Sequence, residues 1–540
     1  MLRKIENFVT LVVCLLTVAP TSNAQITLAE ETANNTSACT LDNQHPYCAS
    51  AFRGLMDGND GTNGDPIETI YPDPAPAHVT SVSLSSTAAP TLMYSGFNGK
   101  FICEYQPWFG LSSHLNVGYS ETNSQTTDAQ AAAMSATGCN IALVSFYGTD
   151  QLHDTDYAFD LQATGTLFTS VGKVSGLKFG IMEVDQAFSG TDTQQDHTGN
   201  CNRFGPNDPA DTVTCIEGAL ENDLEYINTN YVSTSYWTDG SPAKPVMAFF
   251  GSVCDFAALS YGDPPADCHT QGPGPNAVQN WNNIWAAVQS TYPGFKFVFQ
   301  YGAFGRPSSS SGELAWPQPA VWDHNGGNDK EGSQYWWCDP NGLSCANGYL
   351  ENFYSAGVGN PTDLTIGLLD KGFDDTKASW GTDRVTSQQC GQVLLNTAGL
   401  VSSYFGSGGG LSQIPYMQIA TWNDYEEGTE VETGIDNCYT VSASIGSLML
   451  NWMLGSSDLY GFGTTSTIHH FTVWWGAHGD DPNKVLEVAA TNIPSSQTSI
   501  ALSDLVLPHP APNYTVDLYV EMVGIPLFLN RMSGAVPYTY

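Results

Sequence analysis

Residues 414–432 read IPYMQIATWNDYEEGTEVE, a short apolar run followed by a dense group of acids. The run 414–420 is typical of a buried strand. The nine residues from Asp424 to Glu432 contain five carboxylates and no Lys or Arg. Carboxylates packed at the end of a buried strand repel one another, and burial raises their pKa. Because this arrangement is unfavourable by itself, we expect these acids to have a function.

This strand is the last of a series of apolar runs that alternate with helical patterns. The expected strands are Phe101–Tyr105, Ile141–Phe146, Phe179–Glu183, Pro245–Phe250, Phe295–Gln300, Ala320–Trp322, Leu364–Leu369 and Tyr416–Thr421. The expected helices include Asp128–Thr137, Leu220–Tyr231, Ala277–Thr291, Val385–Leu400 and Val441–Leu454. Strands joined by helical crossovers indicate a parallel sheet, and eight such units predict an α/β fold, a (β/α)8 TIM barrel over residues 99–458. The alternative, a doubly wound open sheet, would need a Gly-rich phosphate turn after an early strand, which this sequence lacks.

Other regions flank this barrel. Residues 1–24 combine a basic start, a short apolar run and small residues, which predicts a secretory signal peptide, with a retained signal anchor as the alternative. Residues 25–98 are rich in Thr, Ser, Pro, Asp and Gly and are expected to form a loop-rich segment. Short strands without helices follow the barrel, at Ile468–Trp475, Lys484–Ala490 and Tyr514–Val520. They predict a β-sandwich domain over residues 459–540.

The charge balance limits the partners. With 16 basic and 54 acidic residues the net charge is −38, which argues against nucleic acid and against anionic membranes. Only 13% of residues are charged, so we expect a surface made largely of uncharged polar side chains. A secreted, extracellular monomer that leaves the membrane after signal cleavage is the expected form.

Cysteine spacing agrees with secretion. Cys39 and Cys48, Cys201 and Cys215, Cys254 and Cys268, and Cys338 and Cys345 are near neighbours, and in an oxidising compartment they are expected to close short loops. Cys103, Cys139, Cys390 and Cys438 remain for longer links. No C-x-x-C pair occurs and the His residues are scattered, so we expect no metal site and no cofactor.

The active site of a (β/α)8 barrel lies where the strands end. The strand ends carry Glu104, Gln106, Trp108, Tyr147, Asp150, Glu183, Asp185, Gln300, Tyr301, Trp322, Asp323, His324, Asp370, Lys371, Asp374, Asp375, Asn423, Asp424, Glu426 and Glu427. Carboxylates and amides bind sugar hydroxyls, and aromatic faces cover sugar rings. Glycoside cleavage needs two carboxyl groups, and a tight acidic cluster can keep one of them protonated. Asp424 and Glu427, three residues apart just past a strand, can share one face of a turn.

Simpler interpretations remain open. Any single acid of this chain could belong to a solvated loop, and clustered oxygens also suit calcium, as in a calcium-dependent adhesion module. A non-catalytic carbohydrate-binding or cell-wall protein could use the same barrel. The sequence contains no H-E-x-x-H, G-x-S-x-G or Walker motif.

Residues 422–432 resemble a family motif. They are similar to the W-N-E-W-H-E-G-T-x-I-E of endo-α-mannosidase-like glycoside hydrolases (family 99) and to the W-N-D-Y-G-E of fungal α-1,3-glucanases (mutanases, family 71). The stretch YQPWFG at 105–110 resembles the Y-x-P-W-Y-G of the mannosidase-like group. The loop 114–119 and the stretch 239–247 sit where that group has a His-containing loop and a D-G-K-P-V strand entry.

The resemblance implies a barrel that cleaves α-linked glucan or mannan without a metal. It places the chemistry on Asp424 as general base and Glu427 as general acid, not on Glu426. The first acid is Asp, as in the glucanases, while the E-G-T tail is mannosidase-like, so the mechanism and the sugar stay open. We expect a secreted hydrolase whose most favoured substrate is α-1,3-glucan. Further residues expected to contact substrate are Tyr105, Trp108, Tyr147, Glu183, Tyr301, Trp322, Asp375, Trp422 and Asn423.

Overall fold

The structure is a computed structural model of the full chain. It describes residues 89–149, 156–184, 201, 208–251, 253, 256–263, 273–301, 306–317, 349–375, 378, 385–386, 388–406, 413–456, 463–479, 486–508 and 513–540. The predicted signal peptide and nearly all of the predicted loop-rich segment therefore lie outside the described residues.

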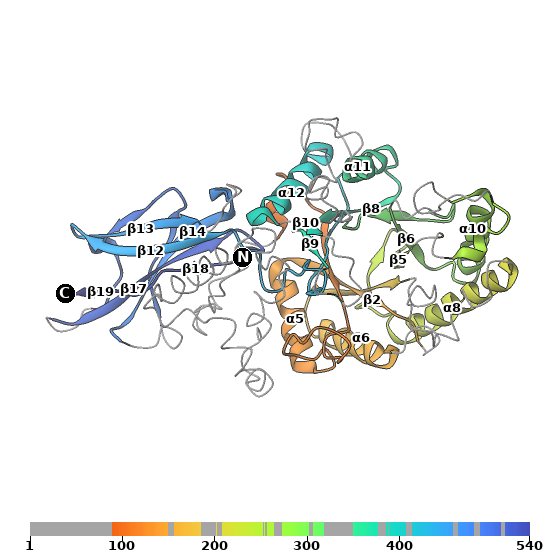
Figure 1. The fold of residues 1–540 in the computed structure, drawn as a ribbon, viewed down its shortest axis with the longest axis horizontal. Coiled ribbons are helices and arrows are strands. Elements are labelled where there is room, and N and C mark those ends of the chain that lie inside the picture. Colours follow the sequence, from red (N-terminus) through yellow and green to blue (C-terminus); the bar gives the residue numbers. More distant parts are fainter. Residues whose placement is uncertain are drawn as a thin grey trace, which may run out of the picture.

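A closed barrel of eight parallel strands forms the larger part of the molecule (Figure 1). In ring order the strands are β1 (Lys100–Tyr105), β2 (Cys139–Phe146), β3 (Lys178–Val184), β5 (Lys244–Phe250), β6 (Lys296–Gln300), β7 (Gly312–Leu314), β8 (Leu364–Leu369) and β11 (Tyr416–Ile419). β3 pairs with β5 and β11 pairs with β1, and these pairings close the ring. The predicted (β/α)8 barrel is confirmed.

Helices surround the barrel on its outside (Figure 1). They are α5 (Ser124–Thr137), α6 (Tyr157–Val171), α8 (Pro209–Asn230), α10 (Pro275–Thr291), α11 (Tyr349–Gly359) and α12 (Gln392–Phe405). Short elements complete this part: η4 (Ala89–Leu92), β4 (Thr238–Asp239), η7 (Ala257–Ser260), β9 (Phe373–Asp374), β10 (Val385–Thr386) and η9 (Gln389–Gly391). The helix expected at 385–400 therefore begins later, at Gln392, because residues 385–386 pair with β9 instead.

The strand expected at 320–322 lies outside the described residues, and β7 fills that place in the ring instead. β7 is three residues long and contains Gly312, so it lacks the apolar run by which the other strands are recognised. A Cβ atom at Gly312 would lie 2.1 Å from the carbonyl oxygen of Leu364. Close contact with β8 therefore requires glycine at this position.

The all-β region begins at about Tyr439. A three-stranded sheet contains β12 (Tyr439–Gly446), β13 (Met449–Ser456) and β16 (Ser499–Ala501). A five-stranded sheet contains β14 (Ile468–Ala477), β15 (Glu487–Pro494), β17 (Thr515–Gly524), β18 (Arg531–Met532) and β19 (Val536–Thr539). The short helices η10 (Thr465–Thr467) and η11 (Leu502–Asp504) lie between strands. Both sheets contribute to one apolar core, which includes Leu450, Trp452, Phe471 and Leu518.

The helix predicted over 441–454 is wrong. These residues form the β12–β13 hairpin, in which Val441, Ala443 and Ile445 are partly buried while the residues between them are exposed. This period-two burial places the apolar side chains against the core of the sandwich. Tertiary packing thus overrides the helical pattern. The pairing with β16 places these strands with the all-β region rather than with the barrel.

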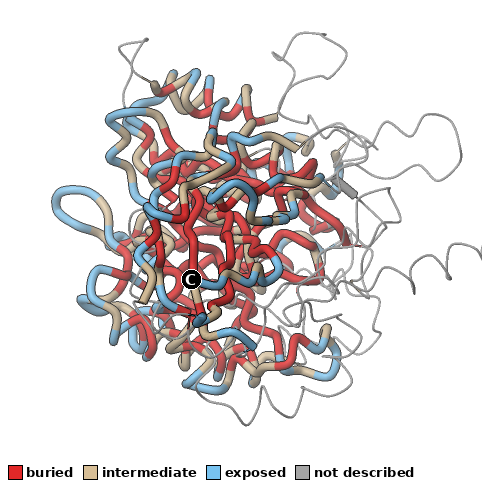
Figure 2. Tube along the Cα trace, turned by 90° about the vertical axis from the view of Figure 1, so that its left-hand side faces the viewer, coloured by how far each residue is buried: buried red, intermediate tan, exposed pale blue. Residues whose placement is uncertain are grey.

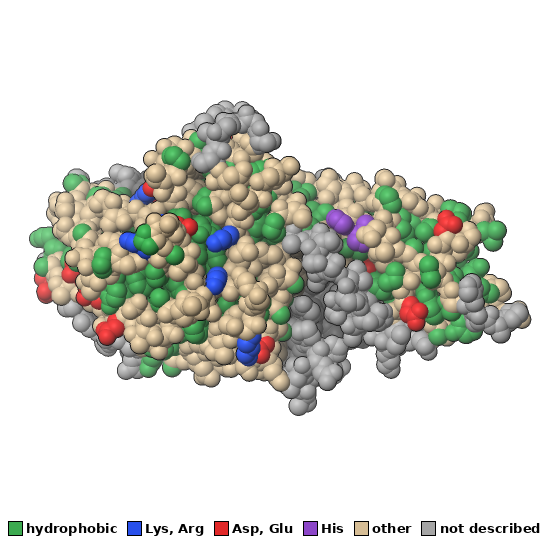
Figure 3. Space-filling model, turned by 180° about the vertical axis from the view of Figure 1, so that it is seen from behind, with side chains coloured by type: hydrophobic (Ala, Val, Ile, Leu, Met, Phe, Trp, Pro, Cys, Tyr) green, Lys and Arg blue, Asp and Glu red, His purple; other side chains and the backbone are tan. Residues whose placement is uncertain are grey.

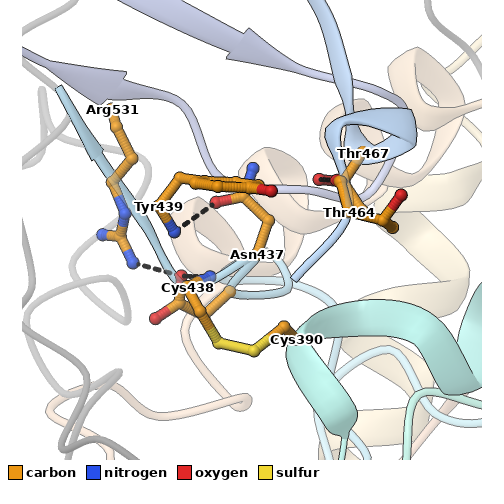
Figure 4. The surroundings of a disulfide bond; sticks show 8 residues. Cys390, Asn437, Cys438, Tyr439, Thr464, Thr467 and Arg531 are labelled. Carbon is orange, nitrogen blue, oxygen red and sulfur yellow. Dashed lines mark hydrogen bonds and ion pairs between the residues drawn. A yellow bond between two sulfur atoms is a disulfide. The ribbon is translucent and has the colours of Figure 1, made fainter. Parts of the chain in front are cut away.

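Three disulfides join the described residues. Cys201–Cys215 is the predicted short loop, while Cys103–Cys139 and Cys390–Cys438 are the longer links. The last one joins the segment before α12 to the start of the sandwich, where Arg531 forms an ion pair with Asp436 over 2.7 Å (Figure 4). The other proposed pairs lie outside the described residues.

Burial is concentrated in the interior of the molecule (Figure 2). Charged side chains are sparse on the face in Figure 3, where the surface is mainly uncharged. Within the part of the chain that the structure describes, no helix has the length and apolar character of a membrane span.

Candidate active site

The last strand places its acidic turn beside the end of the first strand. The amide of Trp422 donates to the carbonyl oxygen of Glu104 over 2.6 Å. The side chain of Asn423 donates to the carbonyl oxygen of Gln106 and accepts from its amide, each over 2.9 Å. Asn423 also donates to Glu121. Trp422 and Asn423 are therefore buried at the end of the last strand, where their hydrogen bonds join β1 to the turn after β11, and their contact with substrate stays a prediction.

Asp424 begins a tight turn after β11. Its amide donates to the hydroxyl of Thr421 over 2.8 Å, and its Oδ1 accepts from the amides of Glu426 and Glu427 over 3.0 Å each. The side chain is 1% exposed, and Oδ2 has no hydrogen-bond partner among the described residues. Glu427 follows on the same turn and is partly exposed. One carboxyl group is thus held rigidly, with its second oxygen buried and unpaired among the described residues.

The two acids influence each other's protonation. Burial raises the pKa of Asp424 well above its ordinary value, and the charges of Glu427 and Glu426 raise it further, against the two backbone hydrogen bonds. Neighbouring carboxyl groups in a buried site share a proton, because both charges together are unfavourable. Burial therefore favours the neutral form of Asp424.

Glu426 has a different role from its neighbour. Its Oε2 lies 2.8 Å from Nδ1 of His114, and its Oε1 accepts from the amide of Leu115 over 2.9 Å. Both oxygens are therefore engaged with the loop after β1. Glu427, three residues after Asp424, is partly exposed, and its catalytic pairing with Asp424 stays a prediction.

Aromatic side chains line the same end of the barrel. Trp108 stacks on His114 with ring centroids 4.8 Å apart and an interplanar angle of 9°, and it lies 5.6 Å from the ring of Tyr147. The hydroxyl of Tyr147 donates to Gln106 over 3.1 Å. The indole Nε1 of Trp108 is buried and has no hydrogen-bond partner among the described residues. Trp108 thus packs between Tyr147 and His114, the ring that lies against Glu426, and the predicted contact of Trp108 and Tyr147 with substrate stays a prediction.

Three predicted contact residues face other parts of the fold. The hydroxyl of Tyr105 donates to Gln130 of α5 over 2.8 Å, so this side chain points to the helices. The pKa of Glu183 is raised well above its ordinary value by burial and by the charge of Asp223 on α8. Tyr301 packs its ring against Tyr349 and Phe353 of α11. These contacts favour structural roles.

Asp375 lies next to the turn, because the amide of the preceding Asp374 donates to the carbonyl oxygen of Glu427 over 2.7 Å. It is fully buried. Trp322, together with the strand-end candidates Asp150, Asp185, Asp323 and His324, lies outside the described residues.

Sequence reasoning gave no individual role to several residues of this region. Lys371 and Glu430 form an ion pair over 2.9 Å that is fully buried. Glu432 accepts from Tyr119 over 3.0 Å and from Tyr425 over 2.9 Å, and burial raises its pKa to about 7. The number of acids after β11 was visible in the sequence, but their partners are far away in the chain. His114 was visible as part of a family-like loop.

No group of three or more His, Cys, Asp or Glu side chains within the described residues is arranged to hold a metal ion.

Comparisons with known proteins give structural similarities only. No family model and no curated protein matches the sequence. The GH99 endo-alpha-mannosidase from Bacteroides thetaiotaomicron shares 13% identity over 62% of this chain and 88% of its own, with a TM-score of 0.37. A glycoside hydrolase family 5 protein from Bacteroides vulgatus shares 12% sequence identity over 75% of this chain and 88% of its own, with a TM-score of 0.29. Bacteroides uniformis beta-glucuronidase 2 shares 9% sequence identity over 82% of this chain and 46% of its own, with a TM-score of 0.37. The solved structures to which this chain is similar thus include glycoside hydrolases of several families.

Proposed function

We propose that this protein is a secreted glycoside hydrolase that cleaves an α-linked polysaccharide, with α-1,3-glucan as the first candidate. The observation that carries the proposal is the pair Asp424 and Glu427, at the carboxyl end of a (β/α)8 barrel. One member is buried with an oxygen that has no hydrogen-bond partner among the described residues, and the other is partly exposed on the same turn. Glycoside cleavage needs one carboxyl group as acid and a second as base or nucleophile.

In the proposed reaction, Glu427 donates a proton to the glycosidic oxygen. Asp424 accepts a proton from the attacking water or from a hydroxyl group of the sugar itself. Burial favours the proton on Asp424 before substrate binds. A sugar hydroxyl that donates to Oδ2 of Asp424 stabilises its ionised form, and the shared proton then resides on Glu427.

The surroundings support a sugar as the ligand. Trp108 and Tyr147 place two packed aromatic rings at this end of the barrel, and the buried Nε1 of Trp108 is a hydrogen-bond donor without a partner among the described residues. A ligand with both apolar faces and hydroxyl groups uses both features. The described disulfides and the signal-like start of the chain support an extracellular place of action.

The first test measures reducing ends released from α-1,3-glucan, α-1,6-mannan, α-1,2-mannan and starch. Wild type is compared with Glu427→Gln and Asp424→Asn. We expect release from one polymer and a loss of about 100-fold or more in each variant, because general acid–base groups contribute at least this much. If the folded protein releases no reducing ends from any of the four polymers, the result would favour a carbohydrate-binding protein on the same barrel.

A second substrate separates the two roles. An aryl glycoside with a good leaving group does not need protonation by an acid. Glu427→Gln should therefore recover most of its activity on such a substrate, and Asp424→Asn should not. Recovery in Asp424→Asn instead would reverse the two roles.

A further inference from the structure

Glu104 is a fully buried carboxyl group near the end of β1. The next residue, Tyr105, points to the helices, where its hydroxyl donates to Gln130. Because successive side chains of a strand point to opposite faces, Glu104 points into the barrel. Its carbonyl oxygen accepts from the amide of Trp422, which places it beside the turn that carries Asp424.

The two oxygens of Glu104 have different surroundings. Oε1 accepts from the hydroxyl of Ser145 over 2.6 Å and from Nε2 of Gln106 over 3.1 Å. Oε2 is buried and has no hydrogen-bond partner among the described residues. In a neutral carboxyl group one oxygen accepts as a carbonyl and the other carries the proton. Two donors on Oε1 thus favour Oε2 as the protonated oxygen.

Asp424 has the same asymmetry. Its Oδ1 accepts two backbone hydrogen bonds, and its Oδ2 is buried without a partner among the described residues. Burial raises the pKa of Glu104 well above its ordinary value, and the charge of Asp424 raises it further, against the hydrogen bond from Ser145. Two carboxyl groups in such a setting are unfavourable when both are ionised.

The other groups around Glu104 are uncharged. β2 presents Ser145 and Leu143, which lies opposite Glu104 in the strand register. β11 presents Gln418, whose amide is buried and has no partner among the described residues. Among the described residues, Asp424 is therefore the charged group that acts on Glu104.

We propose that Glu104 is a positioning residue of the candidate site, a carboxyl group that stays neutral over the active pH range so that Asp424 can ionise and serve as the base, and whose ionisation sets the alkaline limit of that range. The inference rests on the proposed function. A neutral Glu104 adds no charge beside Asp424 and offers its Oε2 proton as a donor. An ionised Glu104 would hold the shared proton on Asp424 and stop its action as a base.

Kinetics of Glu104→Gln test this role, because glutamine is permanently neutral and keeps an acceptor and a donor in place. We expect a kcat within about threefold of wild type at acid pH, and an alkaline limb of kcat/KM that moves to higher pH. Glu104→Leu removes the donor and leaves two buried donors unpaired, so kcat should fall about 10-fold or more. Glu521→Gln, a buried carboxyl variant in the sandwich, should leave the profile unchanged. A pH profile of Glu104→Gln identical to that of wild type overturns the proposal.

A second measurement needs no substrate. The melting temperature is followed against pH in wild type, Glu104→Gln, Asp424→Asn and the double variant. If the two carboxyl groups interact electrostatically, Glu104→Gln changes the pH dependence of the melting temperature less in the Asp424→Asn variant than in wild type. Additive effects at every pH overturn the proposal. Coupling without cleavage of any glycan would support the carboxyl pair while rejecting the proposed hydrolase activity.

Discussion

Glu426 and Glu427 are adjacent in the chain but have different surroundings. Glu426 is 3% exposed and engages His114 and Leu115, more than 300 residues earlier in the sequence, whereas Glu427 is partly exposed beside Asp424. A buried carboxylate whose two oxygens are hydrogen-bonded to a loop holds that loop in place, while a partly exposed carboxylate can exchange a proton with a ligand. Identity alone therefore does not assign the role of an acid in this turn.

At this scale we predict that Glu426→Gln lowers kcat/KM by about 10-fold or less, because the amide oxygen still accepts from the amide of Leu115 while the amide NH2 donates to Nδ1 of a neutral His114. Glu427→Gln should lower it by about 100-fold or more. Both values come from initial rates on the polymer that wild type cleaves. Asp128→Asn, in an exposed ion pair with Lys173, serves as control and should match wild type. An equal loss in Glu426→Gln and Glu427→Gln would contradict the assignment.

The turn after β11 is held by its neighbouring elements. Asn423 joins it to β1, and the amide of Asp374 in β9 donates to the carbonyl oxygen of Glu427. The ion pair Lys371–Glu430 joins it to the segment after β8 and is fully buried. Breaking a buried pair leaves an uncompensated charge, whereas replacing both partners by apolar groups removes it.

We predict that Lys371→Met lowers the free energy of unfolding by about 3–5 kcal/mol, because Glu430 then stays buried without its cation. The double variant Lys371→Met with Glu430→Leu should regain most of this loss. Denaturant titration measures both. Lys173→Met, which breaks the exposed pair with Asp128, should change the free energy by about 1 kcal/mol or less. A double variant no more stable than Lys371→Met alone would contradict the argument.

The molecule as a whole buries many carboxyl groups. Burial raises the pKa of Asp370 and of Glu432 to about 7 each, from ordinary values of 3.8 and 4.5. A carboxyl group with a raised pKa in the folded state binds its proton more tightly there than in the unfolded chain. Its contribution to stability is fully present below the ordinary pKa and is lost as the pH rises through the folded value.

We therefore predict that the free energy of unfolding falls between about pH 5 and pH 7, by up to roughly 1.4 kcal/mol per pH unit for each such group. Asp370→Asn and Glu432→Gln should each flatten this dependence, because a neutral amide takes up no proton. Denaturant titrations at several pH values measure the slope. If the free energy of unfolding rises over this pH range, or if its slope against pH is unchanged in both variants, Asp370 and Glu432 do not control the pH dependence of stability.

Much of this architecture was visible in the sequence. The alternation of apolar runs and helical patterns predicted the closed barrel, because burial on both faces of a parallel strand leaves a local hydrophobic signal. The acidic turn after β11 was also recognisable, because five carboxylates that follow an apolar strand are a local sequence pattern. Both properties depend on residues that are neighbours in the chain.

Tertiary structure decided the rest. β7 carries almost no apolar signal and exists because β6 and β8 supply its partners. Residues 439–456 form a hairpin because their apolar side chains find the core of the sandwich on one face. Glu426 differs from Glu427 through contacts with a loop more than 300 residues earlier, and the charge of Asp424 acts on Glu104 from the other end of the barrel sequence. Local sequence specifies what each segment can form, while burial and charge from distant partners determine which possibility is stable and what each acid does.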